Sequence, residues 1–318
     1  MSCTPSWAQP RVLVAGWSSV LHGEATAGDV LAAAAVCERL RAAGIAHDTA
    51  WSPAMHLAYG DPATEPLLAG ALLDAVDPRA YTHLVFVCGP LTGAPVEELV
   101  AAFGHAQRIA VGVSVLDRDD PAVRGFHHVL ARDAPGAPPQ RDLAARPPAA
   151  ALPLVGVFLA PGQGEYADRR RHGAVTTALG AWLARQRCAR LELETRLDPR
   201  DWRLPATPEQ VLATVGRLDV VVTTRLHGLV LALRAGVPAV AVDPVAGGGK
   251  VTAQARAWDW PALVGAEALL AGGGDRLLDR HLAWALGPAG RAAAGARGDA
   301  APAAGQAALD ALVSLLQG

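Results

Sequence analysis

The chain has 318 residues, of which 51% are hydrophobic and 18% are charged, a length that suits about two domains. Its net charge of −2 argues against a protein that coats nucleic acid or an anionic membrane. Its four cysteines form no Cys-x-x-Cys pair, and there is neither a secretory leader pattern nor an apolar run of about 18 residues. We therefore expect a soluble, cytoplasmic protein without a metal site or a membrane span.

The first part of the chain alternates apolar strand patterns with helical patterns. This alternation is typical of a parallel sheet that helices cover on both faces. The glycine that ends the helical run at 28–44 suits a helix C-terminus. The predicted strands are 11–16, 46–51, 82–89, 108–115 and 126–133, and the predicted helices are 28–43, 65–76 and 96–106.

The alternation restarts after a Pro/Ala-rich stretch, which we interpret as an interdomain linker. The predicted strands there are 154–160, 189–195, 219–224 and 238–244, and the predicted helices are 172–187, 207–218, 229–236 and 251–258. The predicted divisions are an N-terminal domain at 1–133, a linker at 134–153, a C-terminal domain at 154–286, and a low-complexity segment with a terminal amphipathic helix at 287–318. Two α/β units of this kind place a ligand cleft between the carboxyl ends of two sheets.

The most informative motif is the run DVVVTTRLHGLVLALRAGVPAVAVDP at 219–244. A buried strand ends at Thr224, and Arg225 and His227 lie on the turn into the next helix. Helix N-termini present free N–H groups and partial positive charge. With a guanidinium and an imidazole added, the turn suits a phosphate or a carboxylate. The alternative is a structural ion pair of Arg225 and a buried His227.

Lysine is nearly absent from the chain. Lys250 is the single lysine among 28 basic residues, and it follows three consecutive glycines. Lysine and arginine are not interchangeable, because the ammonium is a compact, rotatable charge. In an arginine-biased chain this favours Lys250 as an anion ligand carried by a flexible loop, with a plain surface lysine as the alternative.

The motif resembles the polysaccharide pyruvyl transferase family. The matching residues are Thr223, Arg225, Leu226, His227, Gly236, Pro238, Asp243 and Lys250. In the N-terminal half, Gly16, the pair Gly28-Asp29 and the glycine-rich loop at 85–93 stand where the family has similar elements. The resemblance implies two Rossmann-like domains arranged as in GT-B glycosyltransferases. It also implies transfer of pyruvate from phosphoenolpyruvate, as co-substrate without a further cofactor, to two hydroxyls of a sugar.

Site roles follow from this resemblance. His227 is expected to act as the general acid and Asp29 as a base or sugar ligand. Arg225 would clamp the phosphate of the donor. The expected donor site also contains Thr224, Leu226, Gly228 and Lys250, and the expected acceptor site contains Gly28, Glu24 and His22. The partners would be a small-molecule donor and a glycan or sugar-containing acceptor; the sequence indicates no oligomeric state.

The sequence departs from the family pattern at two places. Thr26 stands where the family has an Asn, and Ala160 and Pro161 stand where the family has a further Arg. The arginines at 169–171 are candidates to replace that charge. A GT-B glycosyltransferase, a nucleotide-sugar enzyme, or a non-catalytic protein that binds a glycan or a phosphometabolite stays open as an alternative. Trp258 and Trp260 either stack on a sugar or pack in the core.

Overall fold

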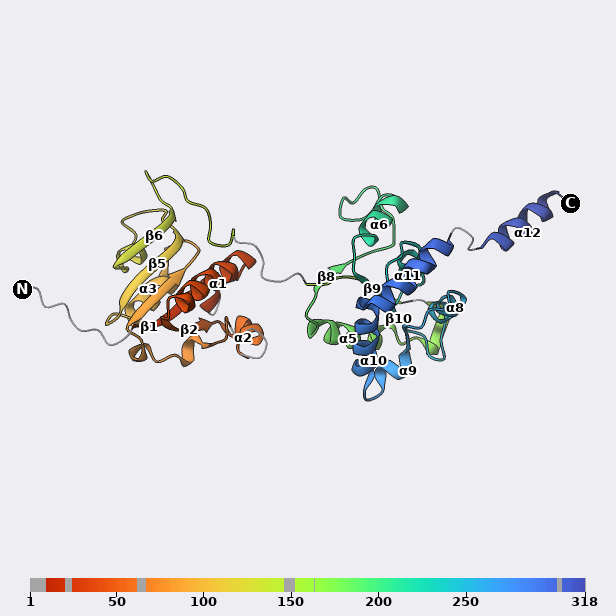
Figure 1. The fold of residues 1–318 in the computed structure, drawn as a ribbon, viewed down its shortest axis with the longest axis horizontal. Coiled ribbons are helices and arrows are strands. Elements are labelled where there is room, and N and C mark those ends of the chain that lie inside the picture. The colour runs from red at the N-terminus through yellow and green to blue at the C-terminus, as the bar shows by residue number, and fades with distance from the viewer. Residues whose placement is uncertain are drawn as a thin grey trace, which may run out of the picture. The chain divides into compact units, whose positions relative to one another are not determined.

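In the computed structural model the chain divides into two compact units, residues 1–149 and 150–318 (Figure 1). The structure describes residues 10–20, 25–61, 67–145, 152–162, 164–301 and 305–317. Within these ranges no helix is both long and apolar enough to cross a membrane. Each unit is built on one parallel β-sheet.

The first unit is a six-stranded parallel sheet with the order β3-β2-β1-β4-β5-β6. This is the strand order 3-2-1-4-5-6 of the doubly wound dinucleotide-binding fold. The strands are β1 (Arg11–Gly16), β2 (Ala46–Trp51), β3 (Gly70–Leu72), β4 (His83–Val87), β5 (Gln107–Ser114) and β6 (His128–Asp133). The helices are α1 (Ala27–Ala42), α2 (Pro53–Tyr59), α3 (Ala94–Ala102) and α4 (Pro121–Arg124).

Alternating side chains of β1 show why both faces of this sheet are covered. Val12 and Val14 pack in a core cluster with α1, whereas Leu13 and Ala15 pack in a second cluster with α3 on the other face. The predicted helix at 65–76 is wrong over its described part, because residues 70–72 form β3 and residues 73–75 form a single 3-10 turn. The short apolar run there extends the sheet beside β2.

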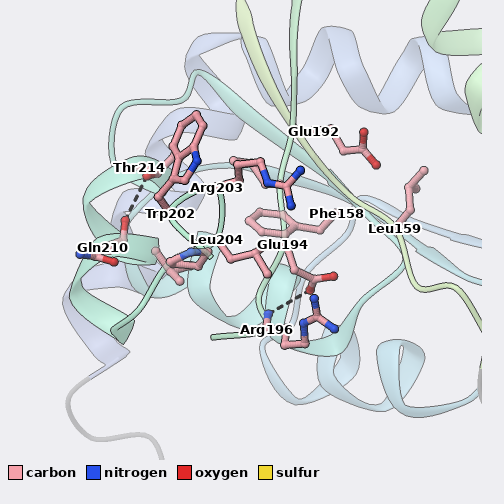
Figure 2. Close-up of a pocket in the computed structure, with 13 residues that line it drawn as sticks. Phe158, Leu159, Glu192, Glu194, Arg196, Trp202, Arg203, Leu204, Gln210 and Thr214 are labelled. Carbon is pink, nitrogen blue, oxygen red and sulfur yellow. Dashed lines mark hydrogen bonds between the residues drawn. The ribbon is translucent and has the colours of Figure 1, made fainter. Parts of the chain in front are cut away.

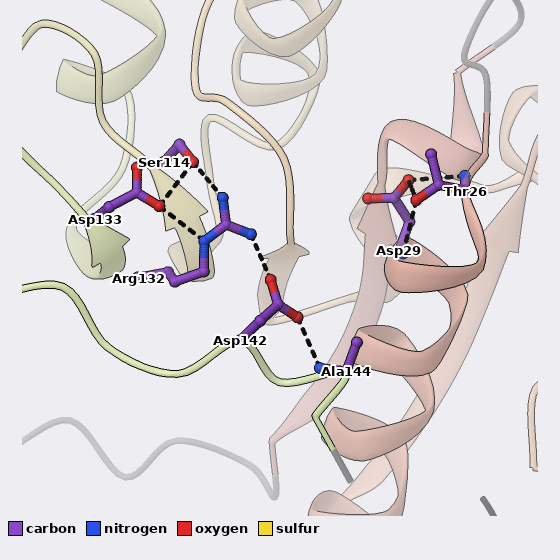
Figure 3. A network of polar contacts seen from close by, with 7 residues as sticks. All are labelled: Thr26, Asp29, Ser114, Arg132, Asp133, Asp142 and Ala144. Atoms are coloured by element: carbon purple, nitrogen blue, oxygen red, sulfur yellow. Dashed lines mark hydrogen bonds and ion pairs between the residues drawn. The ribbon is translucent and has the colours of Figure 1, made fainter.

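The beginning of the predicted linker is fastened to the first unit (Figure 3). Arg132 donates to Asp133 (Nε–Oδ2 2.7 Å) and to Ser114 (Nη2–Oγ 2.6 Å), and it also pairs with Asp142. Asp142 in turn accepts from the backbone N–H of Ala144 at 2.7 Å. Residues 134–145 therefore lie against the carboxyl ends of β5 and β6, although their composition is that of a linker.

The second unit is a five-stranded parallel sheet with the order β8-β7-β9-β10-β11. Counted within the unit, this is the order 2-1-3-4-5 of flavodoxin-like folds. The strands are β7 (Leu154–Phe158), β8 (Ala189–Glu192), β9 (Val220–Thr223), β10 (Ala239–Asp243) and β11 (Leu263–Gly265). The predicted fold class, two doubly wound α/β sheets, is confirmed; the cleft between them stays a prediction.

Helices cover both faces of the second sheet. One core cluster joins α5, α9 and α10 to the sheet, and the other joins α6, α7, α8 and α11. The helices of this unit are α5 (His172–Ala184), α6 (Pro208–Val215), α7 (Leu226–Arg234), α8 (Lys250–Ala257), α9 (Ala266–Leu270), α10 (Gly274–Leu286), α11 (Pro288–Ala300) and α12 (Gln306–Gln317).

Helix α11 forms where the sequence predicts only a low-complexity segment. Its small residues allow it to lie close to its neighbours: a Cβ at Gly290 would come within 2.4 Å of the Trp284 carbonyl oxygen, and a Cβ at Gly298 within 3.0 Å of the Gly236 nitrogen. Ala294 is fully buried. The Ala/Gly-rich composition is thus a packing requirement, not a sign of missing structure. The predicted terminal helix is present as α12, and its leucines are exposed.

Candidate functional site

A pocket of about 330 Å³ lies at the carboxyl ends of β7 and β9 in the second unit. Five residues of the predicted donor site line it, namely Thr224, Arg225, Leu226, His227 and Lys250. The remaining lining residues are Ala160, Pro161, Gly162 and Thr195. The structure therefore brings the motif at 223–227 and the single lysine together, although they are more than 20 positions apart in the chain.

The turn between β9 and α7 is fixed by its two threonines. The Thr223 hydroxyl accepts from the Arg225 N–H (2.9 Å) and donates to the Arg225 carbonyl (3.1 Å). The buried Thr224 hydroxyl accepts from the Ala160 N–H at 2.7 Å. Arg225 is the N-cap residue of α7, so the first turn of this helix forms a wall of the pocket. Such a turn offers backbone N–H groups to an anion.

Gly228 belongs to the packing behind the pocket. It is buried and is not among the lining residues. A Cβ at this position would lie 2.2 Å from the Thr223 hydroxyl oxygen and 3.1 Å from the Phe158 Cβ. Glycine is required here because α7 approaches β7 and β9 so closely. Its contribution to the site is indirect, through the position of the α7 N-terminus.

Arg225, the predicted phosphate clamp, already has a carboxylate partner. Its Nη2 lies 2.8 Å from the Glu194 Oε2, and both side chains are mostly buried, at 22% and 29% exposed. Its Nε donates to the Leu159 carbonyl (2.9 Å), and its Nη1 contacts the Thr195 hydroxyl (3.4 Å). Of the five N–H groups of the guanidinium, two are not used by these contacts. An anion in the pocket would therefore meet an Arg225 that is oriented but partly neutralised.

The two other charged groups of the pocket are more accessible. His227 is exposed, and its ring makes no hydrogen bond within the described part of the chain. The Lys250 Nζ lies 3.7 Å from the Glu165 Oε1, with side-chain exposures of 41% and 59%. A pair this long and exposed is weak. Both His227 and Lys250 are thus available to a ligand.

The glycine loop that precedes Lys250 is held from several sides. The buried Asp243 carboxylate accepts from the N–H groups of Gly249 (2.7 Å) and Thr252 (2.8 Å), which caps α8. Glu267 accepts from the Gly247 N–H at 2.7 Å. Arg169 donates to two carbonyls of the loop, those of Ala246 (2.9 Å) and Gly248 (2.6 Å). Arg169 therefore supports the loop and does not supply the charge missing near Ala160.

The predicted acceptor residues lie in the first unit. Asp29 forms a capping box with Thr26 at the start of α1, with the Thr26 N–H donating at 2.9 Å and its hydroxyl at 2.8 Å to the Oδ2 of Asp29 (Figure 3). Gly28 lies in the first turn of the same helix. Burial, then the neighbouring Asp29, raises the pKa of the Cys88 thiol to about 11. His22 and Glu24 lie outside the described residues.

Asp29 thus has a structural role, and its role as base or sugar ligand stays a prediction. Among the described residues no group of three His, Cys, Asp or Glu side chains is placed to hold a metal ion.

The segment that carries this site matches a known family. Residues 184–244 match the family model of polysaccharide pyruvyl transferases. The matched segment is therefore similar to the pyruvyl transferase family over this part of the chain only. It contains β8, α6, β9, α7 and β10, and with them Glu194, Arg225 and His227. Lys250 and the whole first unit lie outside the match.

The chain is similar in fold to sugar-modifying enzymes of known structure. A spinosyn rhamnosyltransferase in complex with thymidine diphosphate is 12% identical, with 91% of this chain and 95% of that chain covered and a TM-score of 0.32. The heptosyltransferase WaaC of E. coli with ADP is 13% identical, with 73% and 86% covered and a TM-score of 0.30. The UDP-GlcNAc 2-epimerase of Methanocaldococcus jannaschii is 8% identical, with 87% and 92% covered and a TM-score of 0.29. No curated protein sequence matches the chain.

The sequence analysis did not identify Glu194 and Thr195, which lie in the loop after β8. Both contact Arg225, although β7 separates β8 from β9 in the sheet. A usable signal was present, because residues 189–195 were predicted as a strand and the carboxyl ends of parallel strands meet at one edge. What the sequence lacked was the strand order, which places β8 beside β7.

Proposed function

We propose that this protein transfers pyruvate from phosphoenolpyruvate to two hydroxyls of a sugar as a cyclic ketal. The donor would occupy the pocket at the N-terminus of α7. The observation that supports this best is the convergence of Arg225, His227 and Lys250 on one pocket inside or beside the segment that matches the family. Three cationic or protonatable groups and a helix N-terminus suit a donor that carries a phosphate and a carboxylate.

The reaction needs one proton delivered to carbon and two hydroxyl protons removed. A proton adds to the methylene carbon of phosphoenolpyruvate, and one sugar oxygen bonds to the adjacent carbon. The bond from that carbon to the phosphate oxygen breaks, and the second sugar oxygen takes its place. The products are the ketal and inorganic phosphate, so that one hydroxyl proton balances the new methyl group and the other leaves with the phosphate.

The pocket contains one group suited to the proton transfer to carbon and two suited to the anionic groups of the donor. Histidine is the side chain that exchanges protons near neutral pH, so the exposed His227 would protonate the methylene carbon. Arg225, oriented by its three contacts, can hold one anionic group through its remaining N–H groups. Lys250 can hold the other from the opposite loop.

A direct test begins with donor binding. Phosphoenolpyruvate should raise the melting temperature of the full chain and give a calorimetric binding isotherm. His227→Ala and Arg225→Lys should weaken this binding, the latter because an ammonium cannot reproduce the forked donor geometry. Arg234→Ala is the matched control, since Arg234 is exposed at the other end of the same helix.

The second step is the mass of the product. Incubation with phosphoenolpyruvate and an acceptor panel should add one pyruvate, less one water, to an acceptor and release phosphate. Binding of phosphoenolpyruvate without phosphate release on any acceptor would favour a non-catalytic binding protein. Absence of binding would refute the proposal.

A further inference from the structure

A second and larger pocket, of about 610 Å³, opens in the second unit, and Glu194 of the Arg225–Glu194 pair is among its lining residues (Figure 2). Its walls come from the ends of β7 and β8, the loop that follows β8, and α6. Glu194 lines this pocket, while its partner Arg225 lines the donor pocket. The ion pair is therefore shared between the two pockets. Volumes in this range are those of ligand sites.

The loop after β8 contains two consecutive Asp-x-Arg units, which we call the Asp-x-Arg arm (residues 198–205). The Asp198 carboxylate accepts from the backbone N–H of Arg200 at 3.1 Å and from its guanidinium at 2.9 and 3.0 Å. Asp201 pairs in the same way with Arg203, at 2.9 and 2.7 Å. The Asp198 N–H donates to the Pro205 carbonyl at 3.0 Å and closes the arm. These bonds give an exposed loop a defined shape.

The arm presents Trp202 to solvent at the pocket. Trp202 is 92% exposed, whereas Trp260 and Trp182 are buried and donate to a carbonyl and a carboxylate respectively. An indole is a large apolar surface, and exposing all of it on a shaped loop has no packing explanation within the described residues. It is the side chain in this pocket that a flat apolar ligand face would cover.

The charges around the pocket are balanced by local partners. Glu194 is paired with Arg225, and Arg203 is paired with Asp201. Two oppositely charged side chains, Glu192 and Arg196, remain and offset one another. The Gln210 amide oxygen accepts from the Ala206 N–H (2.6 Å), which leaves its NH₂ group free to donate. Such a wall offers hydrogen bonds without net charge, which suits a neutral polyol better than a nucleotide diphosphate.

We propose that this pocket binds a neutral saccharide, with one apolar face of a pyranose stacked on Trp202 and the hydroxyls of the saccharide bonded along the wall that Glu192, Arg196 and Gln210 contribute to. A pyranose combines an apolar C–H face with a rim of hydroxyls, which matches an aromatic plate above a polar wall. The proposal that this pocket is the acceptor subsite of pyruvyl transfer rests on the proposed function. The proposal that it binds a saccharide does not depend on that function. Its place beside the shared ion pair would bring acceptor hydroxyls next to the donor pocket.

The test is saturation-transfer NMR on the full chain with lactose, cellobiose, maltose and, as a competing class, uridine. The variants are Trp202→Ala, Trp202→Phe and Leu197→Ala; the last is the matched control, a partly exposed residue of the same loop outside the pocket. We expect at least one disaccharide to bind at millimolar concentration. Trp202→Ala should weaken this binding about tenfold or more, and Trp202→Phe should retain most of it.

Several outcomes would overturn the assignment. These are binding of none of the three disaccharides, unchanged disaccharide affinity in Trp202→Ala, and a Trp202-dependent response to uridine alone. The melting temperature should not change in Trp202→Ala, because an almost fully exposed side chain contributes little packing. Phosphoenolpyruvate binding in the same variant reports on the donor pocket separately. Saccharide binding without phosphoenolpyruvate binding would remove the proposed function and leave this site standing.

Discussion

Replacing Glu194 with Gln isolates the charge that faces Arg225. Gln has nearly the shape of Glu and keeps an acceptor for the N–H groups of Thr195 and Arg196, which now donate to Oε1 at 2.7 and 2.9 Å. Arg225 keeps its bonds to the Leu159 carbonyl and the Thr195 hydroxyl. The substitution therefore puts an NH₂ group in place of the Oε2 that lies 2.8 Å from the guanidinium, so both the negative charge and the hydrogen bond to Nη2 are removed, and the two other contacts hold the guanidinium.

The expected effect on donor binding follows from Coulomb's law. An anion held on the free edge of Arg225 would lie about 6 Å from the Glu194 carboxylate, and one unit charge at that separation is repelled by about 3 kcal/mol at an effective dielectric constant of about 20. Where water raises that constant to about 60, the repulsion falls to about 1 kcal/mol. The pair is a quarter exposed, so we expect an intermediate value. Glu194→Gln should tighten phosphoenolpyruvate binding about tenfold.

The assay is calorimetric titration of phosphoenolpyruvate and of inorganic phosphate into both proteins at two salt concentrations. The gain should shrink at high salt, because screening weakens the repulsion that has been removed. The melting temperature should fall at the same time, since a mostly buried pair has lost one partner. Glu192→Gln is the matched control: it removes the same charge two residues earlier, from an exposed side chain that forms no ion pair with Arg225 in the described part of the chain. Equal or weaker anion binding in Glu194→Gln would refute the reasoning and would place the ligand elsewhere.

Three other substitutions test the site and its support. Lys250→Arg should lower donor affinity or turnover at least about tenfold with little change in melting temperature, because a bulkier planar group misplaces the anion by about 1 Å. Wild-type donor affinity and turnover in this variant would mean that the single lysine of the chain results from its arginine-biased composition. Gly228→Ala should cost about 1–3 kcal/mol of unfolding free energy in a denaturation series, since its Cβ would lie 2.2 Å from the Thr223 hydroxyl; unchanged stability would mean that α7 shifts freely. His172 is 5% exposed, and neither ring nitrogen has a partner within the described residues, so His172→Leu should stabilise the fold by about 1 kcal/mol. Burial, then Arg170, lowers the pKa of His172, so the unfolded chain binds more protons below pH 6.5; wild-type stability should fall as pH drops through this range, and the variant should show a smaller fall.

The site could be predicted from the sequence where local rules act. A strand end, a helix start and two polar residues on the turn between them lie within one short segment, and in the structure Thr224, Arg225 and His227 line one pocket, while their roles stay a prediction. Lys250 was found by its rarity and not by its surroundings. The interpretation of the loop before it was incomplete: three glycines indicated freedom, but the side chains that hold the loop come from distant parts of the chain.

The residues that the sequence did not reveal depend on long-range placement. Glu194 can pair with Arg225 because β8 lies beside β7 in the sheet, and no local sequence pattern predicts this strand order. Trp258 and Trp260 were considered as sugar-stacking residues, yet Trp260 donates to the Ala239 carbonyl inside the core. The exposed indole is Trp202, whose presentation requires the paired turns of its loop. The sequence did not predict helix α11, because a closely packed helix of small residues has the same Ala/Gly-rich composition as a segment that does not pack against the fold.

The capping of α8 by Asp243 has a consequence for how the pocket selects its ligand. Because hydrogen bonds to carboxylates and from Arg169 hold the backbone from 245 to 252, the Lys250 ammonium can change its position by rotation of its own four-carbon side chain. The ammonium of Lys250 can therefore reach an anion at several nearby positions. The guanidinium of Arg225, in contrast, holds an anion in one orientation only, because its N–H donors are fixed in a plane. Arg225 at the α7 end of the pocket would then select the donor by its geometry. Lys250 at the α8 end would accept a longer or bulkier anion.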